Sequence, residues 1–179
     1  GDCARIARAA AETGEDYRIY ACGGDGTLNE IVTGVRGFHN AAVTAYAGGS
    51  GNDFVRMFDR PEAFTDLNEL LDAKTEEFDL IRVNDGCAFN ICSVGLDARI
   101  GTDVSGYKRI PLLQGFRAYA VSTLVNVARG IGEHYVLEIN GEKIDGEQTM
   151  ICVCSGQFYG GGFHPVPEAD PRDGKLEVL

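Results

Sequence analysis

Apolar positions follow two different periods in residues 1–81. Short apolar runs at 17–22 and 42–46 predict buried strands. Apolar residues spaced three or four positions apart predict helices at 3–12, 27–35 and 61–73, with Asp2 as the N-cap of the first. The third helix is expected to bury Phe64, Leu67, Leu70 and Leu71. This alternation of strands and helices predicts an α/β domain over residues 1–81.

The pattern changes in residues 82–179, where paired strands are expected. Segments 78–83 and 88–92 flank an Asn84-Asp85-Gly86 turn, and segments 135–139 and 143–144 flank Asn140-Gly141, so each pair predicts a hairpin. A further strand is expected at 149–155. Between the hairpins, residues 112–129 predict one helix with a core face of Leu113, Phe116, Ala120, Leu124 and Val127. We therefore expect an antiparallel β domain with one inserted helix.

The run Gly23-Gly24-Asp25-Gly26-Thr27 connects the first strand to the second helix. Glycines allow the backbone to approach a ligand closely, and a helix N-terminus attracts phosphate. Thr27 is expected to cap the helix, with Glu30 completing a capping box. Asp25 would repel a bare phosphate, so it either orders the loop or reaches a metal that accompanies the phosphate. Because a side chain in such a turn cannot be core, we expect Asp25 to serve nucleotide handling rather than folding.

A second glycine turn, Gly48-Gly49-Ser50-Gly51, follows the second strand. Ligands of parallel sheets bind beyond the carboxyl ends of the strands, so both turns are expected at one edge. Near the end of the sequence, Asp170 and Asp173 bracket Pro171, and their carboxylates could converge on a hard cation. On spacing alone, a solvated turn is the favoured interpretation of this segment.

Composition excludes several classes of function. The formal net charge of -11 argues against nucleic acid as the main partner and against broad attraction to anionic membranes, so any membrane contact must be local. No run is long enough for a membrane span, and no signal peptide is evident. The six cysteines form no Cys-x-x-Cys pair, which favours reduced thiols in a cytoplasmic protein.

The two glycine turns carry a family resemblance. Gly-Gly-Asp-Gly-Thr resembles the signature of a superfamily that includes diacylglycerol kinases, sphingosine kinases, NAD kinases and phosphofructokinases. Gly49-Ser50-Gly51-Asn52-Asp53-Phe54 resembles the Gly-Thr-Gly-Asn-Asp-Phe motif of the diacylglycerol and related lipid kinases. Gly95-Leu96-Asp97-Ala98 and the segment from Gly160 to Leu176 also resemble family segments. The resemblance implies a Rossmann-like α/β nucleotide-binding domain, as in phosphofructokinase and NAD kinase, followed by an antiparallel β-sandwich domain.

The activity implied by the resemblance is an ATP- and Mg²⁺-dependent lipid kinase, most often converting diacylglycerol to phosphatidic acid. The implied catalytic residues are Asp25, Asp53 and Asp79. The implied nucleotide-binding residues are Gly23, Gly24, Asp25, Gly26, Thr27, Leu28, Asn29, Ser50 and Asn52. A second, structural metal site is implied at Asp170, Asp173 and a carbonyl near Lys175. We expect a lipid partner at the membrane surface, no nucleic acid, and a cytoplasmic protein with peripheral membrane association; a homodimer is left open.

The sequence departs from the family pattern at several positions. Ser50 replaces threonine, Ala47-Gly48 replaces Pro-Leu, and Ser155 replaces asparagine. The family segments expected before Gly1 and after Leu179 are absent, including the one that supplies the general base, so the isolated chain is expected to be inactive and prone to associate. Asp145-Gly146-Glu147 has the letters of that last segment but is expected to be a hairpin turn.

Three other functions stay open at this point. One is an NAD kinase-like phosphotransferase, and another is a non-catalytic module that binds a nucleotide or a lipid. The third, a dinucleotide-binding oxidoreductase, is disfavoured because Gly-x-Gly-x-x-Gly is absent at the turn.

Overall fold

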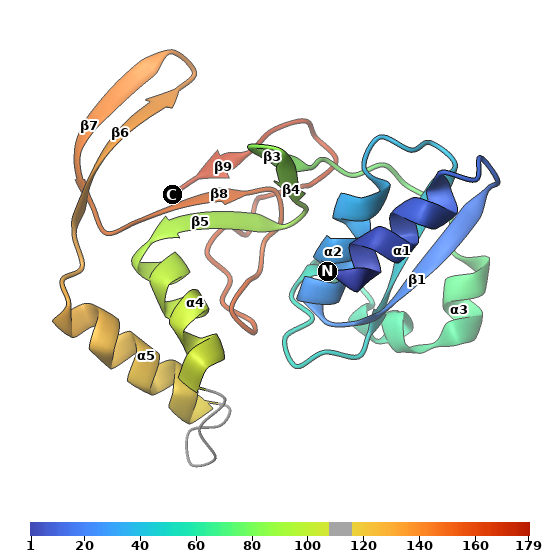
Figure 1. Cartoon of the computed structure of the whole chain (residues 1–179), viewed down its shortest axis with the longest axis horizontal. Helices are drawn as coiled ribbons and strands as arrows, with labels where there is room; N and C mark the ends of the chain where they lie inside the picture. The colour runs from blue at the N-terminus through green and yellow to red at the C-terminus, as the bar shows by residue number, and fades with distance from the viewer. Residues whose placement is uncertain (108–115) are drawn as a thin grey trace. The chain divides into compact units, whose positions relative to one another are not determined.

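The computed structural model describes residues 1–107 and 116–179 (Figure 1). Contacts divide the chain into two compact units. The first combines Gly1–Ile91 with Cys154–Glu177, and the second combines Cys92–Val153 with Val178–Leu179. The expected division near Arg82 followed the order of the sequence. The contacts instead place a late segment with the first unit.

The first unit begins with the alternation that the sequence predicts. Its first elements are α1 (Asp2–Ala11), β1 (Tyr17–Gly23), α2 (Asp25–Val35) and β2 (Ala41–Ala47). Strands β1 and β2 pair in parallel, with Tyr17 opposite Ala41 and Gly23 opposite Ala47. Helices α1 and α2 pack against each other, and their core positions are Ala7, Ala11, Leu28, Ile31 and Val35.

Two cap predictions are wrong. Asp2 is the first residue of α1 rather than its cap. Helix α2 starts at Asp25 with Gly24 as its N-cap, so Thr27 lies inside the first turn and forms no capping box with Glu30. The glycine turn is shorter than expected, because Gly24 is still extended and the helix begins at the next residue.

The helix expected at 61–73 is broken into two short pieces. A 3₁₀ turn at Pro61–Thr65 is followed by α3 (Leu67–Asp72). The break lies at Asp66, whose carboxylate accepts the N–H groups of Asn68 and Glu69 and so starts a new helix. Leu70 is buried, but Leu67 and Leu71 are exposed, and the prediction that both face inward is therefore wrong.

The first hairpin is present but shorter than expected. Strand β3 (Ile81–Val83) pairs antiparallel with β4 (Gly86–Ala88), and Asn84 in the turn between them has a positive φ of 50°. The strand predicted at 88–92 does not continue the hairpin. The next strand, β5 (Ile91–Gly95), joins a different sheet instead.

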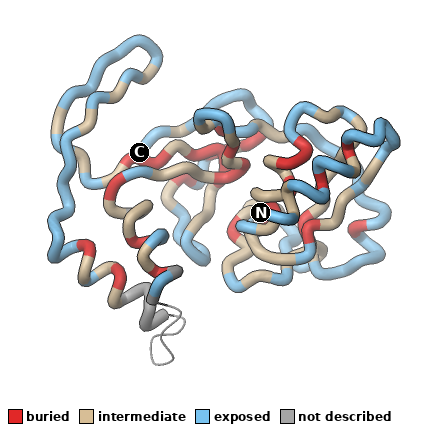
Figure 2. Tube along the Cα trace, viewed as in Figure 1, coloured by how far each residue is buried: buried red, intermediate tan, exposed pale blue. Residues whose placement is uncertain are grey.

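The second unit contains antiparallel β structure, as expected. Its three-stranded sheet has the order β5-β8-β9, where β8 is Met150–Cys154 and β9 is Glu177–Val178. Cys152 and Leu179 exchange both backbone hydrogen bonds, the pattern of an antiparallel pair. A separate hairpin of β6 (Glu133–Ile139) and β7 (Glu142–Gln148) is exposed or half-buried along its whole length (Figure 2).

Two helices lie between β5 and β6, not one. They are α4 (Leu96–Tyr107) and α5 (Phe116–Ala128), which pack against each other. The core face expected for residues 112–129 is wrong where it can be checked, because Leu124 and Val127 are exposed. Leu113 and the side chains of Phe116 and Ala120 lie outside the described residues. None of the helices in the described ranges is long and apolar enough to cross a membrane.

Candidate functional site

The two glycine turns meet at the carboxyl ends of β1 and β2. Gly48 donates its N–H to the carbonyl of Gly23 at 3.0 Å, which extends the strand pairing into the turns. A Cβ atom on Gly24 would lie 3.2 Å from the Cα of Gly49, and one on Gly49 would overlap the backbone of Gly24. Because the two backbones touch, a side chain at Gly49 does not fit.

Asp25 connects the first turn to the second. Its Oδ2 accepts the N–H of Asp53 at 3.0 Å, and its Oδ1 accepts the N–H of Phe54 at 3.0 Å. Both oxygens of one carboxylate therefore fix the start of the segment that carries the second motif. Of the two roles that the sequence left open for Asp25, the structure shows the ordering of the loop. The expectation that Asp25 does not support the fold is corrected by these bonds.

Within the second turn, Asn52 shapes its own loop. Its side-chain Oδ1 accepts the N–H of Gly49 and its Nδ2 donates to the carbonyl of Gly49, each at 2.9 Å. Asn52 also adopts a φ of 53°, a conformation that asparagine tolerates better than most residues. Ser50 is exposed at the tip of this turn, with its hydroxyl open to a ligand.

Asp53 is buried and connects the second turn to the late segment of the chain. The residue is only 6% exposed, and its Oδ2 accepts the N–H of Gly161 at 2.7 Å. Its Oδ1 lies 3.3 Å from the Nε of Arg56 but accepts no hydrogen bond in the described part of the chain. Gly161 lies in the triple glycine, where all three residues have positive φ. This carboxylate thus joins two family segments that are far apart in the sequence.

Arg56 is a site residue that the sequence reading missed. Its guanidinium pairs with Asp53 and donates twice to the carbonyl of Gly51, at 3.0 and 3.2 Å. Its spacing of three residues from Asp53, on the 3₁₀ turn Phe54–Met57, was the available signal. Arg56 is the cation that balances the buried carboxylate.

The structure brings Asp25 and Asp53 together around Gly51. A Cβ atom on Gly51 would lie 3.2 Å from Oδ2 of Asp25 and 3.5 Å from Oδ2 of Asp53. The following residue, Phe54, anchors the motif from the other side, because its ring packs edge-on against Phe89 and Phe78 at 4.8 and 5.7 Å. The carboxylates of Asp25 and Asp53 are thereby held next to the bare backbone of Gly51.

Asp79, the third acid implied by the resemblance, has a different partner. Its Oδ2 accepts the N–H of Gly174 at 2.7 Å, and its backbone N–H donates to the carbonyl of Pro171 at 2.6 Å. Asp79 therefore fixes the 170–174 turn, and the bonds of its carboxylate do not reach Asp25 or Asp53.

Asp170 and Asp173 each pair with a neighbouring basic side chain and do not share a partner. Asp170 accepts from the Arg172 guanidinium at 2.7 and 3.2 Å, and this hydrogen bonding lowers the pKa of the Asp170 carboxyl. Asp173 pairs with the Nζ of Lys175 at 3.2 Å and accepts its N–H at 2.9 Å. Among residues 1–107 and 116–179, no three His, Cys, Asp or Glu side chains cluster as a metal site. The metal site implied here stays a prediction.

The remaining residues of the implied nucleotide set differ in their surroundings. Leu28 is buried in the core, while Oδ1 of Asn29 accepts the N–H of Phe89 at 3.3 Å. Thr27 lies beside Gly23, where its hydroxyl occupies the space that a Cβ would need. Gly26 is exposed and has open space where a Cβ would project. Of these four, Gly26 is the residue whose backbone a ligand can approach most freely.

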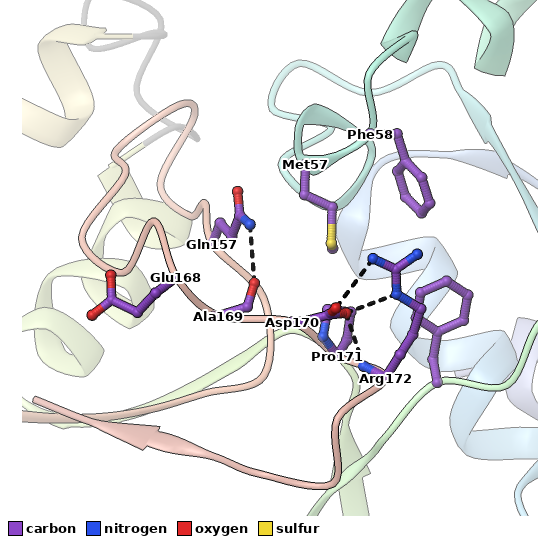
Figure 3. A pocket seen from close by; sticks show the side chains of 9 residues that line it. Met57, Phe58, Gln157, Glu168, Ala169, Asp170, Pro171 and Arg172 are labelled. Atoms are coloured by element: carbon purple, nitrogen blue, oxygen red, sulfur yellow. Dashed lines mark hydrogen bonds and ion pairs between the residues drawn. The ribbon is translucent and has the colours of Figure 1, made fainter.

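A pocket of about 240 Å³ lies beside the 170–174 turn (Figure 3). Met57, Phe58 and Phe78 form its apolar side. The Asp170–Arg172 pair also lines the pocket, and Gln157 donates to the carbonyl of Ala169 at 3.0 Å. The cavity beneath the glycine turns is far smaller, about 10 Å³, and is lined by Gly23, Gly24, Asp25 and Asn52 among others. The surface at the two glycine turns is therefore open and does not form a deep pocket.

The fold and site together define a glycine-turn α/β unit joined to a unit of antiparallel β structure. A family model of the diacylglycerol kinase catalytic domain matches residues 1–83. A model of the YegS C-terminal NAD kinase beta sandwich-like domain matches residues 90–179, which is half of the chain. The chain belongs to this family of diacylglycerol kinase- and YegS-like proteins.

One named relative is similar in sequence, and two solved structures are similar in fold. A protein of Staphylococcus carnosus (strain TM300), named "Putative lipid kinase", is 32% identical over 171 residues, which cover 94% of this chain and 55% of the relative. A crystal structure titled as a diacylglycerol kinase from Bacillus anthracis is 19% identical with a TM-score of 0.67, over 99% of this chain and 57% of that one. A second structure from the same organism reaches a TM-score of 0.73 at 22% identity, over 99% and 59%. The chain thus spans about half the length of the relatives it matches.

Proposed function

We propose that the protein is an ATP- and Mg²⁺-dependent lipid kinase that transfers the γ-phosphate of ATP to a lipid hydroxyl, with diacylglycerol as the substrate and phosphatidic acid as the product. The observation that carries the proposal is the junction of the two glycine turns, with the carboxylates of Asp25 and Asp53 both close to Gly51. The family assignment supports it, since the named relatives are described as lipid kinases.

The residues at this junction fit a nucleotide phosphate. The first N–H groups of an α-helix have no partner within the helix, and the helix end carries partial positive charge. Helix α2 begins at Asp25, and the space beside Gly26 is open, so a phosphate oxygen can reach the backbone there. Ser50 adds an exposed hydroxyl from the second turn. These groups would bind and orient the phosphates of ATP.

The two carboxylates fit magnesium held through water. Each oxygen of Asp25 accepts one N–H, and a carboxylate oxygen has a second lone pair for a water ligand. Mg²⁺ keeps several of its waters in such sites, and when bound it neutralises charge on the phosphates. Asp53, fixed by Gly161 and balanced by Arg56, would hold the same water shell. Asp170 and Asp173 fit a metal less well, because Arg172 and Lys175 already bond to their oxygens.

The test is transfer of γ-labelled phosphate by the full-length protein to a panel of diacylglycerol, a sphingoid base, a polyprenol and NAD. We expect Mg²⁺-dependent labelling of diacylglycerol. Labelling of NAD alone would identify an NAD kinase-like enzyme, and nucleotide binding without any transfer would identify a binding module. Either result would overturn the proposal.

The variant Gly26→Ala makes the test specific to the glycine turn. A Cβ at Gly26 meets no protein atom within 4 Å, so folding should be unaffected, while a phosphate at this backbone would be displaced. We expect a higher KM for ATP and a thermal midpoint that is unchanged or slightly raised, because alanine is the better helix former. An unchanged KM would place the nucleotide elsewhere.

A further inference from the structure

The triple glycine lies at the tip of a small hairpin, residues 158–164, which we call the aromatic hairpin. Tyr159 and Phe163 form its antiparallel bridge and exchange both backbone hydrogen bonds at 2.9 Å. A Cβ atom on Gly160 or Gly161 would meet no protein atom within 4 Å. Because glycine also has the most backbone freedom, neither side-chain packing nor local stiffness fixes these two positions. The position of the tip therefore depends on the base of the hairpin and on the bond that Gly161 makes.

Two aromatic pairs hold the base of the aromatic hairpin. The rings of Phe158 and His164 are stacked, with centroids 3.9 Å apart and planes inclined by 9°. The rings of Tyr159 and Phe163 pack edge to face at 5.4 Å. The carbonyl of Phe158 also accepts a hydrogen bond from the side-chain Nδ2 of Asn90 at 2.8 Å. The base is thereby fixed to the earlier stretch of the first unit.

The tip of the aromatic hairpin ends on the buried carboxylate of Asp53. In the part of the chain that the structure describes, the N–H of Gly161 is the one hydrogen-bond donor to this side chain. The other carboxylate oxygen, Oδ1, has the ion pair with Arg56 at 3.3 Å and no hydrogen bond there. The terminal torsion of a carboxylate is soft, so a single hydrogen bond decides its orientation. The orientation of Asp53 therefore depends on where the hairpin holds Gly161.

We propose that the aromatic hairpin is a positioning element for Asp53 and that its four rings act on the reaction through that carboxylate. The inference rests on the proposed function, in which Asp53 holds water ligands of Mg²⁺. The stacked pair and the edge-to-face pair keep the N–H of Gly161 at 2.7 Å from Oδ2 of Asp53. This backbone donor in turn sets the direction in which the carboxylate presents its remaining lone pairs to the water shell.

Exchange of the Gly161 amide proton with solvent reports on this bond and requires no catalysis, because exchange follows local opening. In the full chain with isotope-labelled glycine, NMR should show that His164→Ala accelerates this exchange about two- to tenfold, the usual contribution of one aromatic pair. His164→Phe keeps a flat ring against Phe158 and should exchange as the unmodified protein does. His39→Ala removes an exposed histidine outside the hairpin and should have no effect. Unchanged exchange in His164→Ala, or equal acceleration in His39→Ala, would overturn the proposal.

A second pair of variants decides the matter if His164→Ala does not fold. Phe163 is 57% exposed, so Phe163→Ala leaves no buried cavity, and it removes the edge-to-face contact with Tyr159. It should accelerate exchange at Gly161, whereas Phe163→Tyr should not. An unchanged thermal midpoint in each variant shows that the effect is local to the hairpin. Equal exchange in Phe163→Ala and Phe163→Tyr would show that the rings do not hold the tip.

Kinase assays on the same variants separate this inference from the proposed function. In His164→Ala, kcat should fall by about the factor by which exchange rises, and the Mg²⁺ concentration at half-maximal rate should increase, while His164→Phe restores both. Faster exchange with unchanged kcat and Mg²⁺ dependence would overturn the positioning role. Absence of phosphate transfer by the unmodified protein would count against the kinase assignment, and the exchange of Gly161 would then decide whether the rings hold Asp53.

Discussion

Asp25 shows how a residue that the sequence associates with a ligand can also hold the fold. Its carboxylate accepts two backbone N–H groups from the second motif, at Asp53 and Phe54. An amide in its place has one acceptor oxygen and would direct an NH₂ group toward one of these donors. The loss of a single acceptor would therefore loosen the segment that carries the second acid.

We predict that Asp25→Asn destabilises the protein as well as reducing catalysis. Leaving a partly buried N–H without its acceptor costs about 1 to 3 kcal/mol. Thermal unfolding should therefore show a midpoint several degrees lower. Asp85→Asn, the same change at an exposed turn residue, is the control and should leave the midpoint unchanged. If Asp25→Asn unfolds at the temperature of the unmodified protein, the two hydrogen bonds that Asp25 accepts from Asp53 and Phe54 do not stabilise the fold.

A second prediction concerns the pKa of Asp170. The Arg172 guanidinium holds the pKa of this carboxyl below its ordinary value of 3.8. A lowered pKa in the folded state means that the pair stabilises the fold above that ordinary value, and that this contribution is lost as the pH falls through the folded-state pKa. Arg172→Ala should raise the pKa of Asp170 toward its ordinary value, which a carboxyl-carbon NMR titration would measure.

The same variant should leave stability at neutral pH nearly unchanged. Both side chains of the pair are about half exposed, and exposed ion pairs contribute little. Lys175→Ala removes the neighbouring pair with Asp173 and should not affect Asp170. A pKa for Asp170 that stays low in Arg172→Ala would show that another group depresses it.

At the scale of elements, the packing of α1 on α2 depends on a glycine. A Cβ atom on Gly34 would overlap the carbonyl oxygen of Ala4 and lie 2.9 Å from its carbonyl carbon. Gly26 in the same helix has nothing within 4 Å of its Cβ position. Packing against α1 therefore requires glycine at position 34, whereas position 26 has room for a side chain.

We expect Gly34→Ala to destabilise the protein by about 1 to 3 kcal/mol, the usual cost of overpacking. Gly26→Ala should be neutral or should stabilise by up to about 1 kcal/mol, because alanine is the better helix former. Chemical denaturation of both variants gives the two free energies of unfolding. Equal values would mean that α1 and α2 separate easily.

The elements that the sequence predicts well are those whose pattern is local. Strands β1 and β2, helix α2 and the β6–β7 hairpin follow from apolar runs and Asn-Gly turns. Helix α5 was predicted to exist, but its inward face was not, because Ser122 and Asn126 turn toward partners on α4 that no local pattern reveals. Helix α4 itself was missed, since it has two glycines and few large apolar residues.

The same distinction holds for the site. The motifs locate the glycine turns, because a strand, a glycine run and a helix are consecutive in the sequence. The bond between Asp53 and Gly161 joins residues 108 positions apart, and no spacing rule predicts it. Arg56 was overlooked for a similar reason, since its role depends on the burial of its partner.

At the scale of the whole molecule, the first unit is assembled from two separate stretches of chain. The late stretch is bonded to the early one at several points: Gly161 to Asp53, Gly174 to Asp79, and Phe158 to Asn90. The backbone of Asn90 also accepts from Ser155 and Gly156. Most of the second unit, Cys92–Val153, is thus inserted between the two stretches of the first.

We predict that the first unit folds without the inserted residues but not without the late stretch. A chain in which a Gly/Ser linker replaces Cys92–Val153 should unfold cooperatively, because it keeps the bonds to residues 154–177. A chain truncated after Ile91 should lose them and unfold at a lower temperature or without a cooperative transition. Calorimetry of the two chains distinguishes the cases. Equal stability would show that the late stretch adds nothing to the first unit.

This arrangement has a consequence for the time course of synthesis. The ribosome completes Ile91 and must then translate the whole insertion before the first residue of the late stretch exists. At usual rates of chain elongation, that interval lasts about 3 to 12 seconds. During it, the N–H of Gly161 is not yet available to the carboxylate of Asp53, and nascent chains carry an unfinished half of the first unit. Slow translation through the insertion would lengthen the period in which chaperones and proteases can bind that half.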